Sequence, residues 1–195
     1  MPTIKTDSIK KVLKAHSKET GLKPFTTQIQ YKDLSPKAYY EYTNTTVLIR
    51  FDSTVFNTKE NIKLFPNSNC KIFPSSDKLF LNFSDDNKNK IFNTREFLKD
   101  IRELEKAPKT SKKETKKHRM IDFRYNTQEF SNYHNTTLPD CIRLDSYHLK
   151  TVIRVFSLLQ CDKIVMTYNE KQPHRPITLK SDLATAIIAP IRYLK

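Results

Sequence analysis

The sequence contains a single glycine, Gly21, among its 195 residues. Phosphate-binding loops of nucleotide enzymes need several glycines at short spacing, because the backbone must turn tightly and approach the phosphate closely. One glycine cannot form a Walker A loop, a GxGxxG dinucleotide fingerprint or a GxSxG nucleophile elbow. Enzymes that depend on these motifs are therefore excluded.

Cysteine is also scarce, and long apolar runs are missing. Cys70, Cys141 and Cys161 form no CxxC pair and are odd in number, which favours isolated thiols over a disulfide or a metal site. No apolar run approaches the roughly 20 residues needed to span a bilayer. The first residues lack the apolar core of a signal peptide. We therefore expect a cytoplasmic protein that does not engage a membrane.

Motifs for catalysis and metal binding are missing as well. The histidines show no HExxH motif and no paired-ligand spacing; they are His16, His118, His134, His148 and His174. Their spacing favours surface positions or polar networks. The acidic pair at 85–86 lies among asparagines, where turn formation explains it. We expect no catalytic residues, no metal and no cofactor, and hence not an enzyme. A nuclease built from scattered acidic residues is the alternative.

Positive charge is what the chain has in excess. Lysine and arginine number 35 against 21 aspartates and glutamates, a formal net charge of +14. Such an excess favours a polyanionic partner, most often nucleic acid. The alternative is a lysine-rich surface that only faces solvent. The length suits one large or two small domains with a real core.

Helical periodicity occurs three times along the chain. The predicted helices are 7–19 with Asp7 as N-cap, 93–106 with Asn93 as N-cap, and a helix from Asp145 or Ser146 to about residue 159. Between them lie short segments rich in aromatic and β-branched residues. The predicted strands are 25–31, 38–42, 46–51, 62–65, 71–73, 78–83, 120–125, 164–168, 177–179 and 185–191. Such runs of strands are longer than βαβ units allow, so an antiparallel α+β fold is favoured.

Two segments read as connections rather than regular structure. The basic run 106–119 has no apolar periodicity, which predicts a mobile loop. It could add non-specific attraction for DNA, although a merely solvated loop is the simpler interpretation. Residues 126–140 are polar and contain a proline, which predicts a further connection.

The end of the chain carries a set of motifs in a fixed order. A helix start DSYHL at 145–149 is followed by PITL at 176–179 and IIAPIR at 187–192. This order resembles the C-terminal end of the bacterial DNA polymerase III beta subunit, the sliding clamp. Weaker likenesses lie upstream, at TNTTVL in 43–48, FPN in 65–67, KIFP in 71–74 and NTREFL in 93–98.

The resemblance implies two clamp-like domains of the processivity fold, with antiparallel sheets and amphipathic helices on one face. Residues 1–90 would correspond to a shortened middle domain of the clamp, and residues 91–195 to its last domain. The second helix of the middle domain has no obvious place between Phe51 and Phe65.

The resemblance also implies a function and its residues. Clamps are not enzymes: they encircle duplex DNA and tether polymerases through a short peptide held in an apolar pocket. The matching DNA contacts would be Lys10, Lys11, Lys14, Lys99, Arg102, Lys150 and Arg154. The matching pocket residues would be Leu48, Pro66, Ile72, Ile187, Ala189, Pro190 and Ile191, although ordinary strand and turn packing would also explain these.

The partners implied are double-stranded DNA and the peptides of a DNA polymerase and a clamp loader. A two-domain chain would need to form a trimer to build a ring of six domains. The alternative is a truncated interaction protein or competitor that binds clamp partners without encircling DNA. A phage or mobile element is the source we expect for such a shortened clamp.

Overall fold

The computed structural model describes residues 4–34, 37–68, 70, 76, 87–106, 115, 117–132 and 141–191. Its helices are α1 (Thr6–Glu19), the 3-10 turn η1 (Pro24–Thr27), α3 (Thr94–Lys106) and α4 (Ser146–Leu158). Its strands in the first half are β1 (Gln28–Leu34), β2 (Lys37–Thr43), β3 (Val47–Asp52), β4 (Ile62–Lys63) and β5 (Lys88–Asn93). Those in the second half are β6 (Met120–Arg124), β7 (Glu129–Asn132), β8 (Cys141–Asp145), β9 (Lys163–Tyr168), β10 (Ile177–Lys180) and β11 (Ala184–Ile188).

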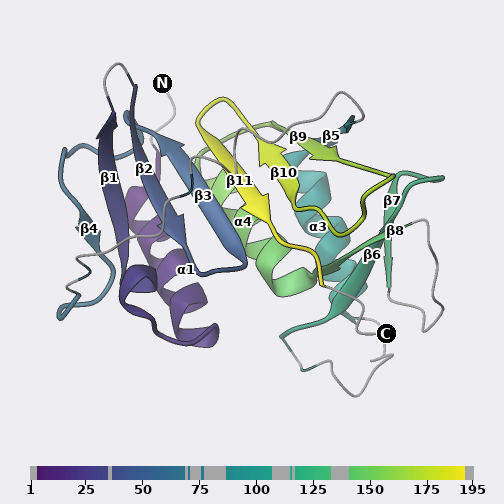
Figure 1. Ribbon diagram of the computed structural model, residues 1–195, viewed down its shortest axis with the longest axis horizontal. Helices are drawn as coiled ribbons and strands as arrows, with labels where there is room; N and C mark the ends of the chain where they lie inside the picture. The colour runs from purple at the N-terminus through teal and green to yellow at the C-terminus, as the bar shows by residue number, and fades with distance from the viewer. Residues whose placement is uncertain are drawn as a thin grey trace.

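The strands form two sheets in which every described pair is antiparallel. The large sheet has eight strands in the order β4-β1-β2-β3-β11-β10-β9-β5, and the small sheet has the order β7-β6-β8. Strands β3 and β11 lie at the centre of the large sheet, although they are far apart in sequence (Figure 1). Their pairing joins the N-terminal and C-terminal halves. The predicted antiparallel α+β fold is confirmed.

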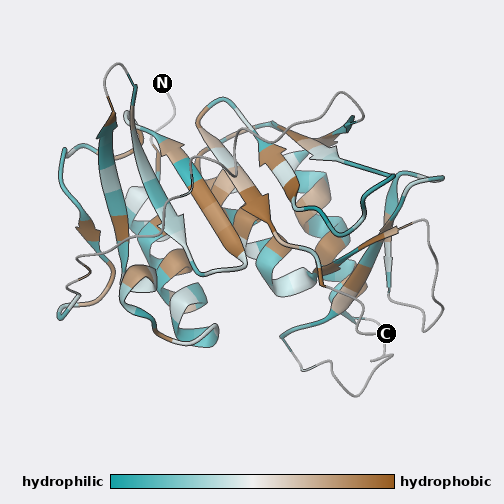
Figure 2. Ribbon diagram, viewed as in Figure 1, coloured by the Kyte–Doolittle hydropathy of each residue, from teal (hydrophilic) through white to brown (hydrophobic). Residues whose placement is uncertain are grey.

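All three long helices lie behind the large sheet in the view of Figure 1, with α4 in contact with both α1 and α3. The inner face of α4 consists of Leu149, Val152, Ile153 and Phe156, which are fully buried. Apolar residues concentrate in the central strands and on the helix faces turned toward them (Figure 2). The core thus lies between one face of the sheet and the helix layer.

Alternation along β3 separates the two faces of the sheet. Val47, Ile49 and Phe51 belong to the core shared with the helices. Because side chains alternate along a strand, Leu48 and Arg50 lie on the opposite face. The sheet therefore has one face toward the helices and one face turned away from them.

Two of the predicted helix caps are confirmed. The side chain of Asn93 accepts hydrogen bonds from the amides of Arg95 at 3.0 Å and Glu96 at 3.2 Å. Asp145 caps α4 by accepting from the amide of Tyr147 at 2.8 Å. Both caps satisfy amides that have no partner within the helix.

The predicted cap of the first helix is wrong. Helix α1 begins at Thr6, and Lys5 precedes it without a side-chain cap. Asp7 therefore lies within the first turn, where its carboxylate pairs with Lys10 at 3.1 Å. An acid in this turn still interacts favourably with the positive end of the helix dipole.

Several strand predictions also differ from the structure. Residues 24–27 form a 3-10 turn rather than the start of a strand, held by Thr26, whose hydroxyl donates to the carbonyl of Lys23 at 2.9 Å. Strand β7 lies within the predicted polar connection, and β8 was not predicted at all. The final strand ends at Ile188, before Pro190, which has no amide hydrogen for a ladder.

Some predictions fall outside the described residues or stay predictions. The strands at 71–73 and 78–83 and most of the basic run lie outside them. Residues 51–68, all described, contain no helix, in line with the expected absence of one between Phe51 and Phe65. The domain boundary at 90–91 stays a prediction; β5 pairs over its whole length with β9 of the C-terminal half. None of the described helices is long and apolar enough to cross a membrane.

Candidate nucleic-acid face and peptide pocket

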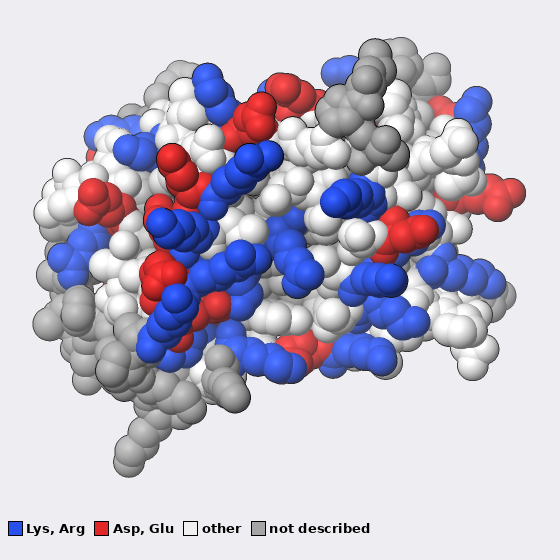
Figure 3. Space-filling view, turned by 180° about the vertical axis from the view of Figure 1, so that it is seen from behind, with Lys and Arg blue, Asp and Glu red and all other residues white. Residues whose placement is uncertain are grey.

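The helix layer forms one broad face of the molecule. Figure 3 shows the side behind the sheet, with lysine and arginine side chains spread across it and acidic side chains among them. Helix α1 has four lysines and two acids, and α4 has two basic residues and no acid. Helix α3 has four basic and four acidic residues. The excess positive charge of this face therefore lies on α1 and α4.

Three of the seven predicted DNA-contacting side chains are engaged within the protein. Lys10 pairs with Asp7, and Lys150 lies 2.5 and 2.7 Å from the two carboxylate oxygens of Glu105 on α3. The ammonium group of Lys14 lies 5.2 Å from the centre of the Phe65 ring. Cation–π and ion-pair contacts of this kind hold a side chain in place.

The other four predicted cations lie exposed on the helices. They are Lys11 on α1, Lys99 and Arg102 on α3, and Arg154 on α4. Within the part of the chain that the structure describes, none of them is in an ion pair. Asp100 and Glu103 are neighbours of the two on α3 in sequence, whereas Lys11 and Arg154 lie on the helices that carry an excess of positive charge.

Five of the seven predicted pocket residues lie in one region. Leu48 on β3 is the cross-strand partner of Ile187 on β11, on the sheet face away from the helices. Both side chains are buried, with 6% and 5% of their area exposed. The segment from Ala189 to Ile191 follows directly and is half-buried.

Two backbone hydrogen bonds hold this segment after β11. The amide of Ala189 donates to the carbonyl of Thr46 at 2.9 Å, and the amide of Ile191 donates to the carbonyl of Arg143 at 2.9 Å. Pro190 is therefore held between a turn of the N-terminal half and strand β8. The segment has a defined position next to the Leu48–Ile187 pair.

The remaining two predicted pocket residues do not join this region. Pro66 follows the edge strand β4 and is exposed, and β1 and β2 lie between β4 and β3 in the sheet. Ile72 lies outside the described residues. The described wall is thus made by Leu48, Ile187 and residues 189–191.

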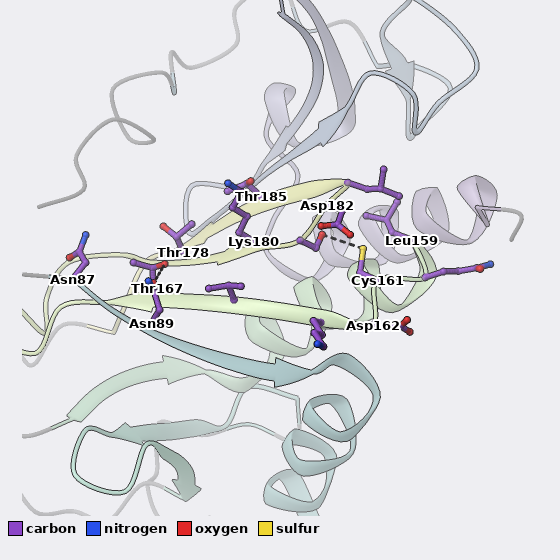
Figure 4. A pocket seen from close by; sticks show the side chains of 15 residues that line it. Asn87, Asn89, Leu159, Cys161, Asp162, Thr167, Thr178, Lys180, Asp182 and Thr185 are labelled. Atoms are coloured by element: carbon purple, nitrogen blue, oxygen red, sulfur yellow. Dashed lines mark hydrogen bonds between the residues drawn. The ribbon is translucent and has the colours of Figure 1, made fainter. Parts of the chain in front are cut away.

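A separate hollow of about 1120 Å³ lies beside this wall and was not foreseen (Figure 4). Its lining comes from β5, β9, β10 and β11 and from the turns at 159–162 and 181–183. It is rich in hydroxyl and amide groups, including Asn89, Thr167, Thr178 and Thr185. The Cys161 thiol donates to Ser181 at 3.2 Å, and burial raises the pKa of this thiol. None of the six predicted pocket residues that the structure describes lines the hollow.

A buried polar network at the contact of α1 with α4 was also missed as a structural feature. His16 on α1 lies 2.9 Å from His148 on α4 and 3.0 Å from the hydroxyl of Tyr42 on β2. Burial, with His148 and His118 nearby, lowers the pKa of His16 to about 3. No spacing rule could have paired two histidines 132 positions apart. Within the described part of the chain, no group of histidine, cysteine and acidic residues is arranged to hold a metal ion.

Comparison with solved structures identifies the fold. The beta subunit of the DNA polymerase of Streptococcus pyogenes superposes with a TM-score of 0.58 and 13% identity, over 96% of this chain and 64% of that chain. The sliding clamp of Bacillus subtilis superposes with a TM-score of 0.57 and 12% identity, over 100% of this chain and 67% of that chain. The sliding clamp of Pseudomonas aeruginosa superposes with a TM-score of 0.59 and 8% identity, over 95% of this chain and 64% of that chain.

These similarities confirm the sliding-clamp fold. The chain spans about 64% of the length of the S. pyogenes subunit. No protein-family model and no curated protein sequence matches the chain.

Proposed function

We propose that this protein is a non-catalytic, sliding-clamp-like processivity factor that holds duplex DNA against its helix face. The observation that carries the proposal is the clamp fold over nearly the whole chain, with a cationic α1 and α4 in that layer. Double-stranded DNA would be its first partner, and no cofactor is required. The cytoplasm is the compartment in which such a factor would act.

The helix face would meet phosphates rather than bases. Lysine and arginine on helix surfaces contact the DNA backbone without reading its sequence, which is what sliding requires. Lys11 and Arg154 are the leading contacts, because both are exposed, neither is in an ion pair among the described residues, and α1 and α4 carry fewer acids than α3. Lys14, Lys99 and Arg102 would contribute next, whereas Lys10 and Lys150 would first have to leave Asp7 and Glu105.

The experiment for DNA binding compares charge reversals on opposite faces. The double variant Lys11→Glu, Arg154→Glu removes two phosphate contacts, so the slope of log affinity against log salt should fall by about 1.8 for B-DNA. The control is Lys163→Glu, Lys180→Glu, which makes the same charge change beside the hollow on the sheet side. Equal losses of DNA affinity in the two double variants would contradict a DNA site on the helices.

The apolar wall would hold a partner peptide. A peptide with leucine or phenylalanine anchors, as from a polymerase or clamp loader, would place these side chains against Leu48, Ile187 and residues 189–191. Pro66 and Ile72 stay candidates for the rest of the pocket. Ile191→Asp should remove peptide binding, and Leu22→Asp should leave it unchanged because Leu22 is exposed elsewhere, at 58%. Peptide binding retained in Ile191→Asp would contradict this site.

The second candidate is a clamp-like interaction protein that never encircles DNA. The observation in its favour is length: the chain spans 64% of the S. pyogenes subunit, so any ring requires several copies. A trimer would supply six clamp-like domains through head-to-tail contacts. Light scattering after size exclusion separates the two candidates. A trimer retained on nicked circular DNA and lost on its linearisation supports a ring, and a persistent monomer supports the interaction protein.

A further inference from the structure

The polar network between α1 and α4 links the two halves of the chain. His16 is fully buried on α1, and its ring nitrogens face Tyr42 of β2 and His148 of α4. The ring of Tyr147, also on α4, stacks on His16 with centroids 5.4 Å apart. A change in the protonation of His16 therefore acts directly on the α1–α4 contact.

The hydrogen atoms in this network can be assigned by following Ser17. Its oxygen lies 3.0 Å from the carbonyl oxygen of Leu13 and 2.5 Å from that of Thr26, and its hydrogen goes to these carbonyls because they can only accept. Because a hydroxyl has one hydrogen, the Ser17 oxygen must accept from Tyr42 at 3.0 Å. The hydroxyl of Tyr42 has then used its hydrogen, and its oxygen accepts from Nδ1–H of His16.

The second ring nitrogen of His16 is therefore an acceptor. Neutral imidazole has one N–H, so Nε2 of His16 accepts from Nδ1–H of His148 at 2.9 Å. The amide nitrogen of Asn44 also faces Nε2, at 3.4 Å. The Asn44 oxygen accepts from the amides of Thr46 and Val47, which fixes the amide nitrogen toward His16. With these hydrogens in place, a proton added at Nε2 would meet the N–H groups of His148 and Asn44, both of which are donors.

The acidic groups of the network lie beyond His16. Asp145 lies 2.7 Å from His118 and 3.9 Å from Nε2 of His148. Glu19 lies 3.8 Å from Nε2 of His118 and 2.5 Å from Lys117. A proton on His148 would thus face Asp145 and leave the bond to His16 in place, whereas a proton on His16 would be a buried charge with no acidic group beside it among the described residues.

We propose that this network is a pH-sensitive latch: low pH releases α1 from α4 while the large sheet stays paired, because His16 takes up a proton far more readily in water than in its buried site. An opened latch exposes His16 to water, where it takes up a proton near its ordinary pKa of 6.5. The opened population therefore rises by up to about tenfold for each pH unit below that value. The latch does not depend on the DNA or peptide proposal.

Amide hydrogen exchange tests the latch in the unmodified protein. Between pH 7.5 and pH 5, protection of the α1 amides from Leu13 to Ser17, corrected for intrinsic rates, should fall by about tenfold or more. Protection of the β9 and β10 amides should fall much less. Equal losses in helix and sheet would mean general destabilisation and would overturn the proposal, as would unchanged protection in α1.

Imidazole nitrogen NMR tests the assignment of hydrogens. His16 and His148 should both be the Nδ1–H tautomer at pH 7.5. A neutral His16 with its hydrogen on Nε2 would reverse the chain of donors and overturn the argument.

A matched pair of variants isolates His16. In His16→Gln the amide can donate to Tyr42 and accept from His148 but takes up no proton in this range. In this variant the α1 amides should be protected from exchange at pH 7.5, and their protection should not fall at pH 5. The control His174→Gln changes an exposed histidine outside the network, and its α1 amides should still lose protection at pH 5. A full pH response in His16→Gln would overturn the latch. Should His16→Gln not fold, the exchange and tautomer measurements on the unmodified protein decide.

Discussion

At the scale of single residues, several charged or polar side chains are buried away from water and depend on partners within the protein. Arg143 on β8 and Asp122 on β6 form a bidentate ion pair at 2.8 and 3.1 Å, with 6% and 3% of their side chains exposed. The backbone carbonyl of Arg143 also accepts a hydrogen bond from the amide of Ile191. This pair thus sits at the end of the apolar wall, which makes its integrity relevant to the candidate pocket.

Arg143→Met should be strongly destabilising. The change leaves the Asp122 carboxylate buried without its partner, which typically costs about 3–5 kcal/mol. Urea unfolding at pH 7.5 measures the loss. The control is Lys106→Met in the exposed Lys106–Glu103 pair, where less than about 1 kcal/mol is expected. Similar losses in the two variants would contradict the importance of burial.

Buried His16 should make global stability depend on pH. Its pKa in the folded protein, about 3, is below its ordinary 6.5, so the unfolded chain binds more protons between these values. The contribution of the neutral ring to the free energy of unfolding is therefore complete above pH 6.5. As the pH falls below this value, the contribution is lost by up to about 1.4 kcal/mol per pH unit. Urea midpoints at pH 7.5 and 5.5 check this. His16→Gln should show a smaller difference between the two midpoints than the unmodified protein.

At the scale of elements, local sequence signals explain where helices begin better than where strands lie. Asn93 and Asp145 each precede a helix with a periodic apolar face, and both cap it. Strand β8 was not predicted because Arg143 interrupts its apolar residues. In the folded chain this arginine is buried in an ion pair with Asp122 of β6. Segment 24–27 has the alternation of a strand, yet the bonds of Thr26 with Lys23 make it a 3-10 turn.

Asn93→Ala should weaken α3. The change removes the acceptor for the amides of Arg95 and Glu96, and loss of such a cap costs about 1 kcal/mol. Chemical denaturation measures this cost. Asn57→Ala, an exposed loop change, is the control and should have little effect. An equal effect of the two changes would argue against the cap.

At the scale of the whole molecule, one core serves both predicted domains. The apolar cluster contains Ile9 and Tyr40 of the N-terminal half together with Phe156 and Ile188 of the C-terminal half. The sheet runs without interruption through the β3–β11 pair. The two halves of the chain are therefore coupled through one apolar cluster and one sheet.

Thermal unfolding at pH 7.5 should therefore be a single transition. A shared core and a continuous sheet couple the halves, so the calorimetric and van't Hoff enthalpies should agree. Differential scanning calorimetry makes this comparison. Two resolved transitions would contradict the coupling and would favour domains that unfold independently.

The DNA and peptide residues show how far sequence reasoning reached. The resemblance selected cations on three helices, and the helices do share one face. It could not show that Lys150 is paired with Glu105 of another helix. It brought Leu48 and Ile187 into one set, and they are neighbours across two strands. It also included Pro66, which lies beyond β1 and β2 at the edge of the sheet.

The sequence by itself determined the antiparallel α+β class, the three helices, two of their caps and the clamp resemblance. These depend on apolar periodicity, capping residues and ordered motifs, which are local in the chain. Tertiary structure alone decided which cations are paired, where β8 lies, and that His16 and His148 meet. Those features depend on groups up to 132 positions apart and on burial that only the folded chain creates. The end of the chain therefore identified the fold, while packing decided which of its residues are available to a partner.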